Sequence, residues 1–92
     1  MNSTSPWRLI VERSAEKSLA RLPRREAERV LSALNQMSQN PFAGDVRRLT
    51  NQPSAYRRRV GNWRIFFDVN YQPRLIAVVA IERRTTTAYR KR

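Results

Sequence analysis

The segment from Tyr56 to Val69 constrains the fold of this chain more than any other part of it. It reads as two strands joined at Gly61-Asn62, a pair that favours the tight two-residue turn of a β-hairpin. That turn places Arg59 directly opposite Arg64 on the neighbouring strand. Like charges in this position destabilise a strand pair. We therefore expect the hairpin to hold an anion.

Side chains alternate between the two faces of a strand, which divides the arginines of this hairpin. Arg57, Arg59 and Arg64 share the more open face. The other face is expected to form the core, and its residues are largely apolar or aromatic: Tyr56, Val60, Trp63, Ile65, Phe67 and Val69. Arg58 is the exception on the core side, and we expect its long stem to carry the guanidinium to the edge of the sheet.

The composition points to an anionic partner. The chain has 92 residues, which suits one small domain, and a net charge of +12. Arginine greatly outnumbers lysine, and its planar guanidinium suits phosphate groups and base stacking. Nucleic acid, the ribosome or an acidic protein are the partners that such a chain favours. Cysteine and histidine are absent, so we expect no disulfide, no metal site and no cofactor.

The ends of the chain and its hydropathy suggest a cytoplasmic protein. Residues 1–6 read as a disordered tail without the basic and apolar regions of a signal peptide. No apolar run approaches the roughly 18 residues of a membrane span, so no membrane partner is expected. Residues 7–92 are predicted to form a single domain.

Two helices are predicted in the first half of the domain, after a first strand at residues 7–11. Ser14 is a candidate cap for a short helix, and Pro23 is expected to end it and to fit the first turn of the next. The second helix has a clear apolar stripe, which is more typical of a core-facing surface than of a partner site. The residues of the stripe are Ala27, Val30, Leu31, Leu34 and Met37. Asn40-Pro41 is expected to end this helix.

Residues 41–54 show no sustained periodicity and are predicted to be a linker. After the hairpin, a turn is expected at Asn70–Pro73, followed by an apolar strand at residues 75–81 that is buried on both faces. The predicted order is β-α-α-β-β-β, an α+β domain in which a helical hairpin packs on a mainly antiparallel sheet.

The same register can be extended through the second turn. A four-residue loop and an unbroken strand place Arg64 opposite Val79 and give Arg83 the same face as Arg64. Four candidate phosphate ligands would then lie on one side of the sheet. The alternative is a set of solvated surface arginines, which the like-charge pairing disfavours.

Arginines bind phosphate, but strand cleavage needs more. Attack by the 2′-hydroxyl of RNA requires removal of a proton, stabilisation of the transition state and protonation of the leaving oxygen. Arginines suit the second role and, because they stay protonated, serve the other two poorly. With histidine absent, Tyr89 is a plausible base, since nearby arginines favour phenolate. A tyrosine that packs on the sheet is the alternative.

The hairpin, the helical turn at Leu22-Pro23 and the C-terminal sequence IERRTTTAYRKR together resemble the RelE/ParE superfamily of bacterial toxins. The resemblance implies a small cytoplasmic toxin held inactive by an antitoxin protein. In the RelE branch, it implies metal-independent cleavage of mRNA in the ribosomal A site. The residues that match the superfamily pattern are Arg57, Arg59, Arg64, Arg83 and Tyr89. Arg84 and Arg90 are further candidates for phosphate binding.

Two alternatives stay open at this point. The ParE branch has the same fold, inhibits DNA gyrase and generally lacks the C-terminal catalytic set, so Arg83 and Tyr89 favour the ribonuclease reading. A module that binds RNA or the ribosome without cleavage is the other alternative. The chain also departs from the ribonuclease pattern, because arginines replace the paired lysines and the acid–base histidine or glutamate is missing. The antitoxin is expected to be an acidic segment, helical or extended, laid across the helices and the basic face.

Overall fold

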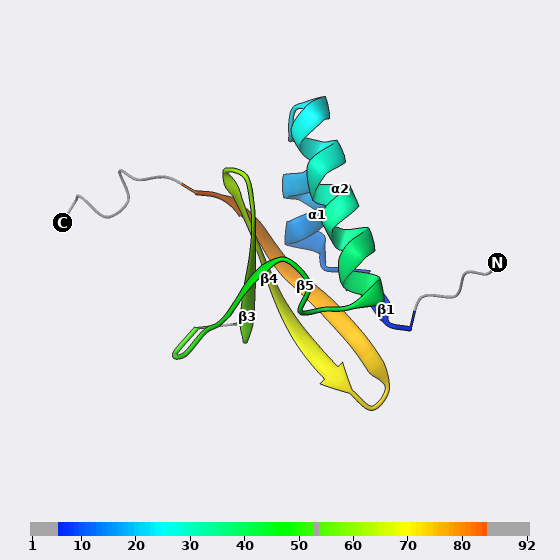
Figure 1. Ribbon diagram of the computed structural model, residues 1–92. Coiled ribbons are helices and arrows are strands. Elements are labelled where there is room, and N and C mark those ends of the chain that lie inside the picture. Colours follow the sequence, from blue (N-terminus) through cyan, green and yellow to red (C-terminus); the bar gives the residue numbers. More distant parts are fainter. Residues whose placement is uncertain (1–5, 53, 85–92) are drawn as a thin grey trace.

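The structure is a computed structural model that describes residues 6–52 and 54–84. Two helices pack on one side of a five-stranded sheet (Figure 1). The elements are β1 (Arg8–Val11), α1 (Arg13–Ala20), α2 (Arg24–Gln39), β2 (Asp45–Arg48), β3 (Tyr56–Val60), β4 (Trp63–Tyr71) and β5 (Arg74–Arg83). The predicted α+β fold with a mainly antiparallel sheet is confirmed, with one strand more than expected.

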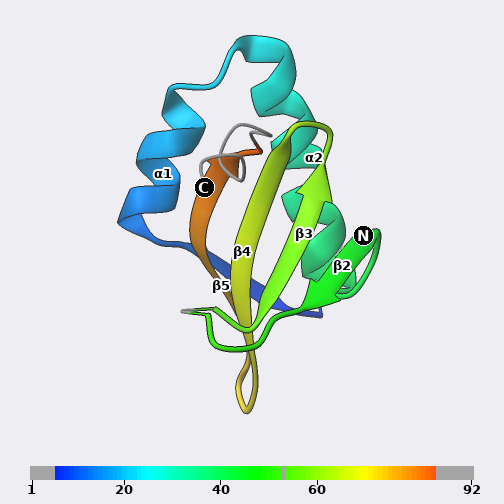
Figure 2. The same cartoon turned by 90° about the vertical axis from the view of Figure 1, so that its left-hand side faces the viewer.

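The strands follow the order β1-β5-β4-β3-β2. Only β1 and β5 run parallel, and the other neighbouring strands are antiparallel. Because the helices cover one face, the opposite face of the sheet is open, and Figure 2 views it directly. Within the described residues, no helix is long and apolar enough to cross a membrane.

The core lies between α2 and the central strands. Phe67, Ile65 and Ile76 are fully buried from the sheet, and Val30 and Met37 meet them from α2. This confirms the core-facing stripe of the second helix with one correction. Leu31 is half-exposed, and Ala33 is buried instead, because the buried face of α2 is rotated slightly from the predicted stripe.

The starts of both helices differ from the prediction. The N-cap of α1 is Glu12, and Ser14 lies inside the first turn, where its hydroxyl donates a hydrogen bond to the carbonyl of Val79 at 3.0 Å. Ser14 therefore ties α1 to β5 rather than capping the helix. Pro23 is the N-cap of α2 rather than its first residue. The predicted end at Asn40-Pro41 is confirmed, since α2 stops at Gln39.

The predicted linker contains an edge strand. β2 pairs antiparallel with β3, so the first hairpin strand is not at the edge of the sheet. Val46 is the one apolar residue in β2, and the sequence therefore carries no hydrophobic alternation there. An edge strand of this kind is held mainly by backbone hydrogen bonds to its neighbour.

The second turn and the β4–β5 register also differ from the prediction. Tyr71 pairs with Arg74, which leaves a two-residue turn instead of a four-residue loop. A register shift lies between Phe66 and Phe67, so β5 carries one extra residue at this point. Both differences move the partner of Arg64 from Val79 to Glu82.

Candidate functional site on the open face of the sheet

The hairpin register at the centre of the site is confirmed. Val60 pairs with Trp63, and Arg59 lies directly opposite Arg64. Gly61 makes this tight turn possible because its φ of +58° lies in the left-handed region that favours glycine. The two arginines are therefore held on neighbouring strands by the backbone of the hairpin.

An acid stands at each end of this arginine pair. Across the sheet, Asp45 pairs with Arg59, and Glu82 pairs with Arg64, which gives a four-residue row with the arginines in the middle. Arg59 Nε lies 3.9 Å from Asp45 Oδ2, and both side chains are about half exposed. The sequence does not reveal this compensation, because β2 has a single apolar residue and the β4–β5 register contains an irregularity.

Arg57 lies in the next row of the open face, opposite Arg47 on one side and Phe66 on the other. Its side chain is only 9% exposed, and its buried Nη1 has no hydrogen-bond partner among residues 6–52 and 54–84. Burial is the main cause that lowers the pKa of Arg57; Asp45 opposes this shift, and the neighbouring arginines add to it. An anion beside Arg57 would relieve this electrostatic cost.

Arg83 does not share the face of Arg64, contrary to the prediction. It pairs with Trp63, which faces the helices, and its Cζ lies 5.8 Å from the centre of the Trp63 ring. The next residue, Arg84, donates its N–H to the carbonyl of Asn62 at 2.6 Å. The backbone at Arg84 therefore still lies beside the turn of the β3–β4 hairpin. Arg84 follows the last residue of β5, so only its backbone is placed by this bond.

Two of the predicted site residues, Tyr89 and Arg90, lie outside the described residues. The described part of the site therefore consists of Arg57, Arg59 and Arg64 on the open face, with Arg84 at its C-terminal edge.

A small hollow on the open face adjoins the arginines. Its volume is about 280 Å³, and its lining includes Phe66, Ser54 and Glu82. The loop between β2 and β3 borders the hollow and is held down by Asp68, whose Oδ1 accepts a hydrogen bond from the N–H of Ala55 at 2.7 Å. Asp68 thus fixes the loop between β2 and β3. Phe66 is the hairpin aromatic that faces this hollow.

The aromatic residues on the other face are used for packing. Tyr56 stacks on Phe67 with ring centres 5.5 Å apart, and Phe42 meets the edge of Tyr56. The Trp63 indole N–H donates to Glu26 Oε1. These rings are therefore not free to stack on bases.

Arg58 is buried under α2 rather than at the edge of the sheet. Its side chain is 8% exposed, and Nη2 donates to Gln36 Oε1 at 2.7 Å. Gly44 leaves room for the guanidinium, because a Cβ there would lie 2.6 Å from Arg58 Cζ. Burial is the main cause that lowers the pKa of Arg58, and Asp45 partly opposes it.

The carboxylates of the described residues are scattered. Residues 6–52 and 54–84 contain no group of three acidic side chains that could hold a metal ion. The open face therefore offers a row of guanidinium groups and an adjoining hollow lined by the partly buried ring of Phe66. Such a surface suits the charged backbone of a single-stranded nucleic acid.

Comparison with solved structures identifies the fold. The archaeal RelE–RelB complex from Pyrococcus horikoshii OT3 matches with a TM-score of 0.78 and 23% identity, over 88% of this chain and 98% of that one. The isolated RelE toxin of E. coli matches with a TM-score of 0.74 and 16% identity, over 90% of both chains. The YoeB/ParE toxin from Agrobacterium tumefaciens matches with a TM-score of 0.70 and 19% identity, over 85% of this chain and 99% of that one.

No curated protein sequence matches the chain. A family description does match it, that of the ParE toxin of the parDE type II toxin–antitoxin system, over residues 9–87. This match covers both helices, the strands β2 to β5, β1 from its second residue and the arginines of the open face. Its fold is that of the solved RelE toxins, and the chain belongs to the ParE toxin family of type II toxin–antitoxin systems.

Proposed function

We propose that this toxin is a metal-independent endoribonuclease that cleaves mRNA in the ribosomal A site and so inhibits translation. The observation that carries the proposal is the grouping of Arg57, Arg59 and Arg64 on one open face of the sheet. Arg59 and Arg64 oppose each other across the hairpin, and a phosphate between them would relieve their repulsion.

The three arginines would have different roles at the phosphate. Arg57 and Arg59 lie two residues apart on β3 and would bind the backbone of the RNA. Arg64 lies in the middle of the row on β4, where its half-buried guanidinium would face the reacting phosphate. Preorganised charge in a partly dehydrated site stabilises a transition state in which negative charge develops.

The remaining groups would come from the C-terminal segment. Tyr89 is proposed as the base that takes the proton of the 2′-hydroxyl, and Arg90 as a further phosphate ligand. The resemblance assigns charge stabilisation to Arg83, but its position over Trp63 argues for a contribution from Arg84, whose backbone lies beside the hairpin turn. We therefore propose that Arg84 shares this role.

Inhibition of DNA gyrase is the second candidate function. It is favoured by the match to the ParE toxin description over most of the chain. The open face would then bind a protein surface. Its arginines would contribute to binding and would take part in no chemical step. A module that binds RNA without cutting it would use the same face and would leave transcripts intact.

The proposed partners are a cognate antitoxin, mRNA and the ribosome, which would place the toxin in the cytoplasm. The matched archaeal toxin was solved in complex with RelB, and the structural match covers 98% of that matched chain. The net charge of +12 suits an acidic antitoxin segment.

Mapping of 5′ ends by primer extension on mRNA from expressing cells tests the proposal. Wild-type protein should produce new ends, and Tyr89→Phe and Arg64→Gln should abolish them. Arg8→Gln is a matched control, because it removes one exposed arginine from β1 at the far edge of the sheet. Growth arrest with intact transcripts in the wild type would refute cleavage and favour gyrase inhibition.

A further inference from the structure

The hollow on the open face of the sheet has the composition of a site for one planar ring. Its lining combines apolar side chains with hydroxyl, amide and carboxylate groups: Phe66 and Ala80, with Ser14, Gln52, Ser54 and Glu82. Apolar walls with a few polar groups hold a small molecule and fix its orientation. The volume of about 280 Å³ is smaller than that of most sites for drug-sized ligands, so the hollow suits a single ring system.

A row of paired residues on neighbouring strands joins this hollow to two arginines. From β2 to β5 its members are Arg47, Arg57, Phe66 and Ala80. Neighbouring strands lie about 4.8 Å apart, so Phe66 and Ala80 lie roughly 5 and 10 Å across the sheet from Arg57. One nucleotide spans such a distance between its phosphate and its base.

Arg57 indicates that an anion binds at the arginine end of this row. Its side chain is nine-tenths buried, and its Nη1 has no hydrogen-bond partner in the described part of the chain. Arg47 lies directly opposite it on β2, and two like charges in this position destabilise a strand pair. A phosphate between the two guanidinium groups relieves that repulsion. The base of the same nucleotide then lies beside Phe66.

Glu82 is an unexpected residue on a surface that binds phosphate, because a carboxylate repels it. The ion pairs within residues 6–52 and 54–84 are Arg24–Glu28 and Arg59–Asp45, so Glu82 forms none there. Glu82 lines the hollow beside Phe66. A carboxylate in such a place accepts a hydrogen bond from the exocyclic amino group of a base, as glutamate does from cytosine N4. Glu82 is therefore suited to read the base in the hollow.

We infer that this hollow binds one nucleobase of the RNA and selects cytosine over uracil, with the ring against Phe66 and its amino group at Glu82. The phosphate of the same nucleotide lies between Arg47 and Arg57. Uracil has a carbonyl oxygen where cytosine has the amino group, and the carboxylate repels that oxygen. The inference rests on the part of the proposed function in which the open face binds RNA, and it does not depend on cleavage.

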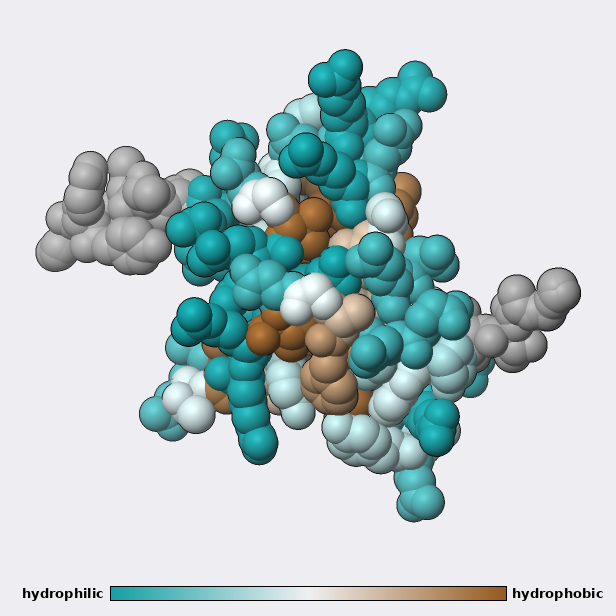
Figure 3. Space-filling view, viewed as in Figure 1, coloured by the Kyte–Doolittle hydropathy of each residue, from teal (hydrophilic) through white to brown (hydrophobic). Residues whose placement is uncertain are grey.

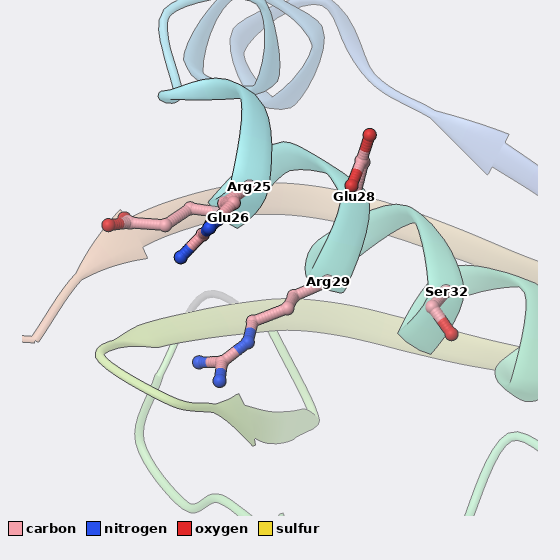
Figure 4. Close-up of a pocket in the computed structure, with 5 residues that line it drawn as sticks. All are labelled: Arg25, Glu26, Glu28, Arg29 and Ser32. Carbon is pink, nitrogen blue, oxygen red and sulfur yellow. The ribbon is translucent and has the colours of Figure 1, made fainter.

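Other parts of the surface suit a base less well. In the view of Figure 3 the surface is mainly hydrophilic, with small hydrophobic patches near its middle. A larger hollow of about 550 Å³ lies along α2, and Figure 4 shows the charged side chains that line it, among them Glu26, Glu28 and Arg29. The described residues of that lining include no aromatic ring on which a base could stack. Phe66 therefore distinguishes the hollow of the open face.

Anisotropy titrations of the purified full chain test the inference with two fluorescein-labelled oligonucleotides, hexacytidylate and hexauridylate. Both carry 2′-O-methyl groups, so the 2′-hydroxyl cannot attack and binding is measured without cleavage. The wild type should bind hexacytidylate about tenfold more tightly, as expected for one hydrogen bond to a charged group. Glu82→Gln should reduce this ratio to less than about twofold, because the amide can bond to either base. Glu82 is exposed at the end of β5, so this substitution leaves the fold intact.

Glu28→Gln is the matched control, because it makes the same change on the exposed side of α2. Figure 4 shows this side chain pointing away from the β3–β4 hairpin. The control should retain the tenfold ratio. Phe66→Leu should weaken binding of both oligonucleotides by about tenfold, as expected for the loss of one stacking contact. Arg57→Gln should weaken both by a similar factor, because the phosphate is common to them.

Two results would overturn the inference alone. The first is equal affinity of the wild type for both oligonucleotides, with both weakened by Arg57→Gln. The second is a tenfold ratio that Glu82→Gln leaves unchanged. Failure to bind either oligonucleotide would overturn the inference together with the proposed RNA-binding role of the open face. Selective binding by a protein that leaves mRNA intact would support the inference and refute only cleavage, so the two proposals fail separately.

Discussion

Arg59 and Arg64 lie directly opposite each other on β3 and β4, and each has an acid as its partner on the strand beyond. The row therefore runs acid, arginine, arginine, acid across four strands. The acids limit the repulsion between the arginines when no ligand is bound. A phosphate that binds between the arginines must compete with these carboxylates.

Removing one of the acids should strengthen RNA binding. In Asp45→Asn, Arg59 loses the carboxylate that lies 3.9 Å from it, and its guanidinium becomes fully available to a phosphate. We expect tighter binding of fluorescein-labelled oligouridylate in anisotropy titrations, with a salt slope steeper by up to about 0.7. An unchanged slope would show that Arg59 does not contact the RNA.

The corrected position of Arg83 gives a second prediction. Arg83→Gln should retain more cleavage activity than Arg84→Gln, because Arg83 lies over Trp63 on the helix side. Loss of a transition-state contact should reduce the rate by about 100-fold, as for the removal of one oxyanion donor. Single-turnover cleavage by both variants measures the difference. A larger loss in Arg83→Gln would restore the role that the resemblance assigns to Arg83.

Arg58→Met should stabilise the isolated toxin by about 1 kcal/mol, because it removes a buried and unpaired charge and keeps an apolar stem of similar length. Burial lowers the pKa of Arg58, so the fold disfavours its charged form relative to the unfolded chain. Arg58 is protonated in both states from about pH 5 to 9, so the gain should not vary with pH. Urea unfolding measures it, and a loss of stability would show that the bond to Gln36 outweighs the burial cost.

The loop between β2 and β3 should depend on Asp68. Asp68→Ala removes the acceptor of the Ala55 N–H, which Asp68 holds at 2.7 Å. We expect hydrogen exchange at Ala55 to accelerate by about tenfold, which corresponds to the typical free-energy contribution of one hydrogen bond. Exchange in the β4–β5 ladder should stay unchanged. Equal acceleration in both regions would instead indicate global destabilisation.

The sequence determined the first hairpin well because a two-residue turn leaves only one register. Gly61 marks the turn, and the register that follows from it pairs Arg59 with Arg64, as the structure confirms. The apolar periodicity of α2 and the apolar run of β5 likewise predicted the core. The run did not show that β5 is fully buried on one face only, at Ile76, Val78 and Ile81. These patterns are visible in sequence because burial repeats with the period of the element.

The failures have equally specific causes. β2 has a single apolar residue, Val46, because an edge strand buries little, and no alternation marks it. The polar residues near Asn70 resemble a turn, although the ladder continues through Tyr71. The register shift between Phe66 and Phe67 is not visible in the alternation of side chains along the sequence. Sequence alone therefore could not place Arg83 on the helix side or identify Glu82 as the partner of Arg64.

The central claim is that the arginines of the open face cut RNA rather than only bind a partner. Addition of the purified toxin to ribosomes that translate a defined mRNA tests it most directly, with a parallel assay of DNA supercoiling by gyrase. We predict mRNA cleavage at the A site by the wild type, no cleavage by Arg64→Gln and unaffected supercoiling in both. Intact mRNA together with inhibited supercoiling by the wild type would contradict the account.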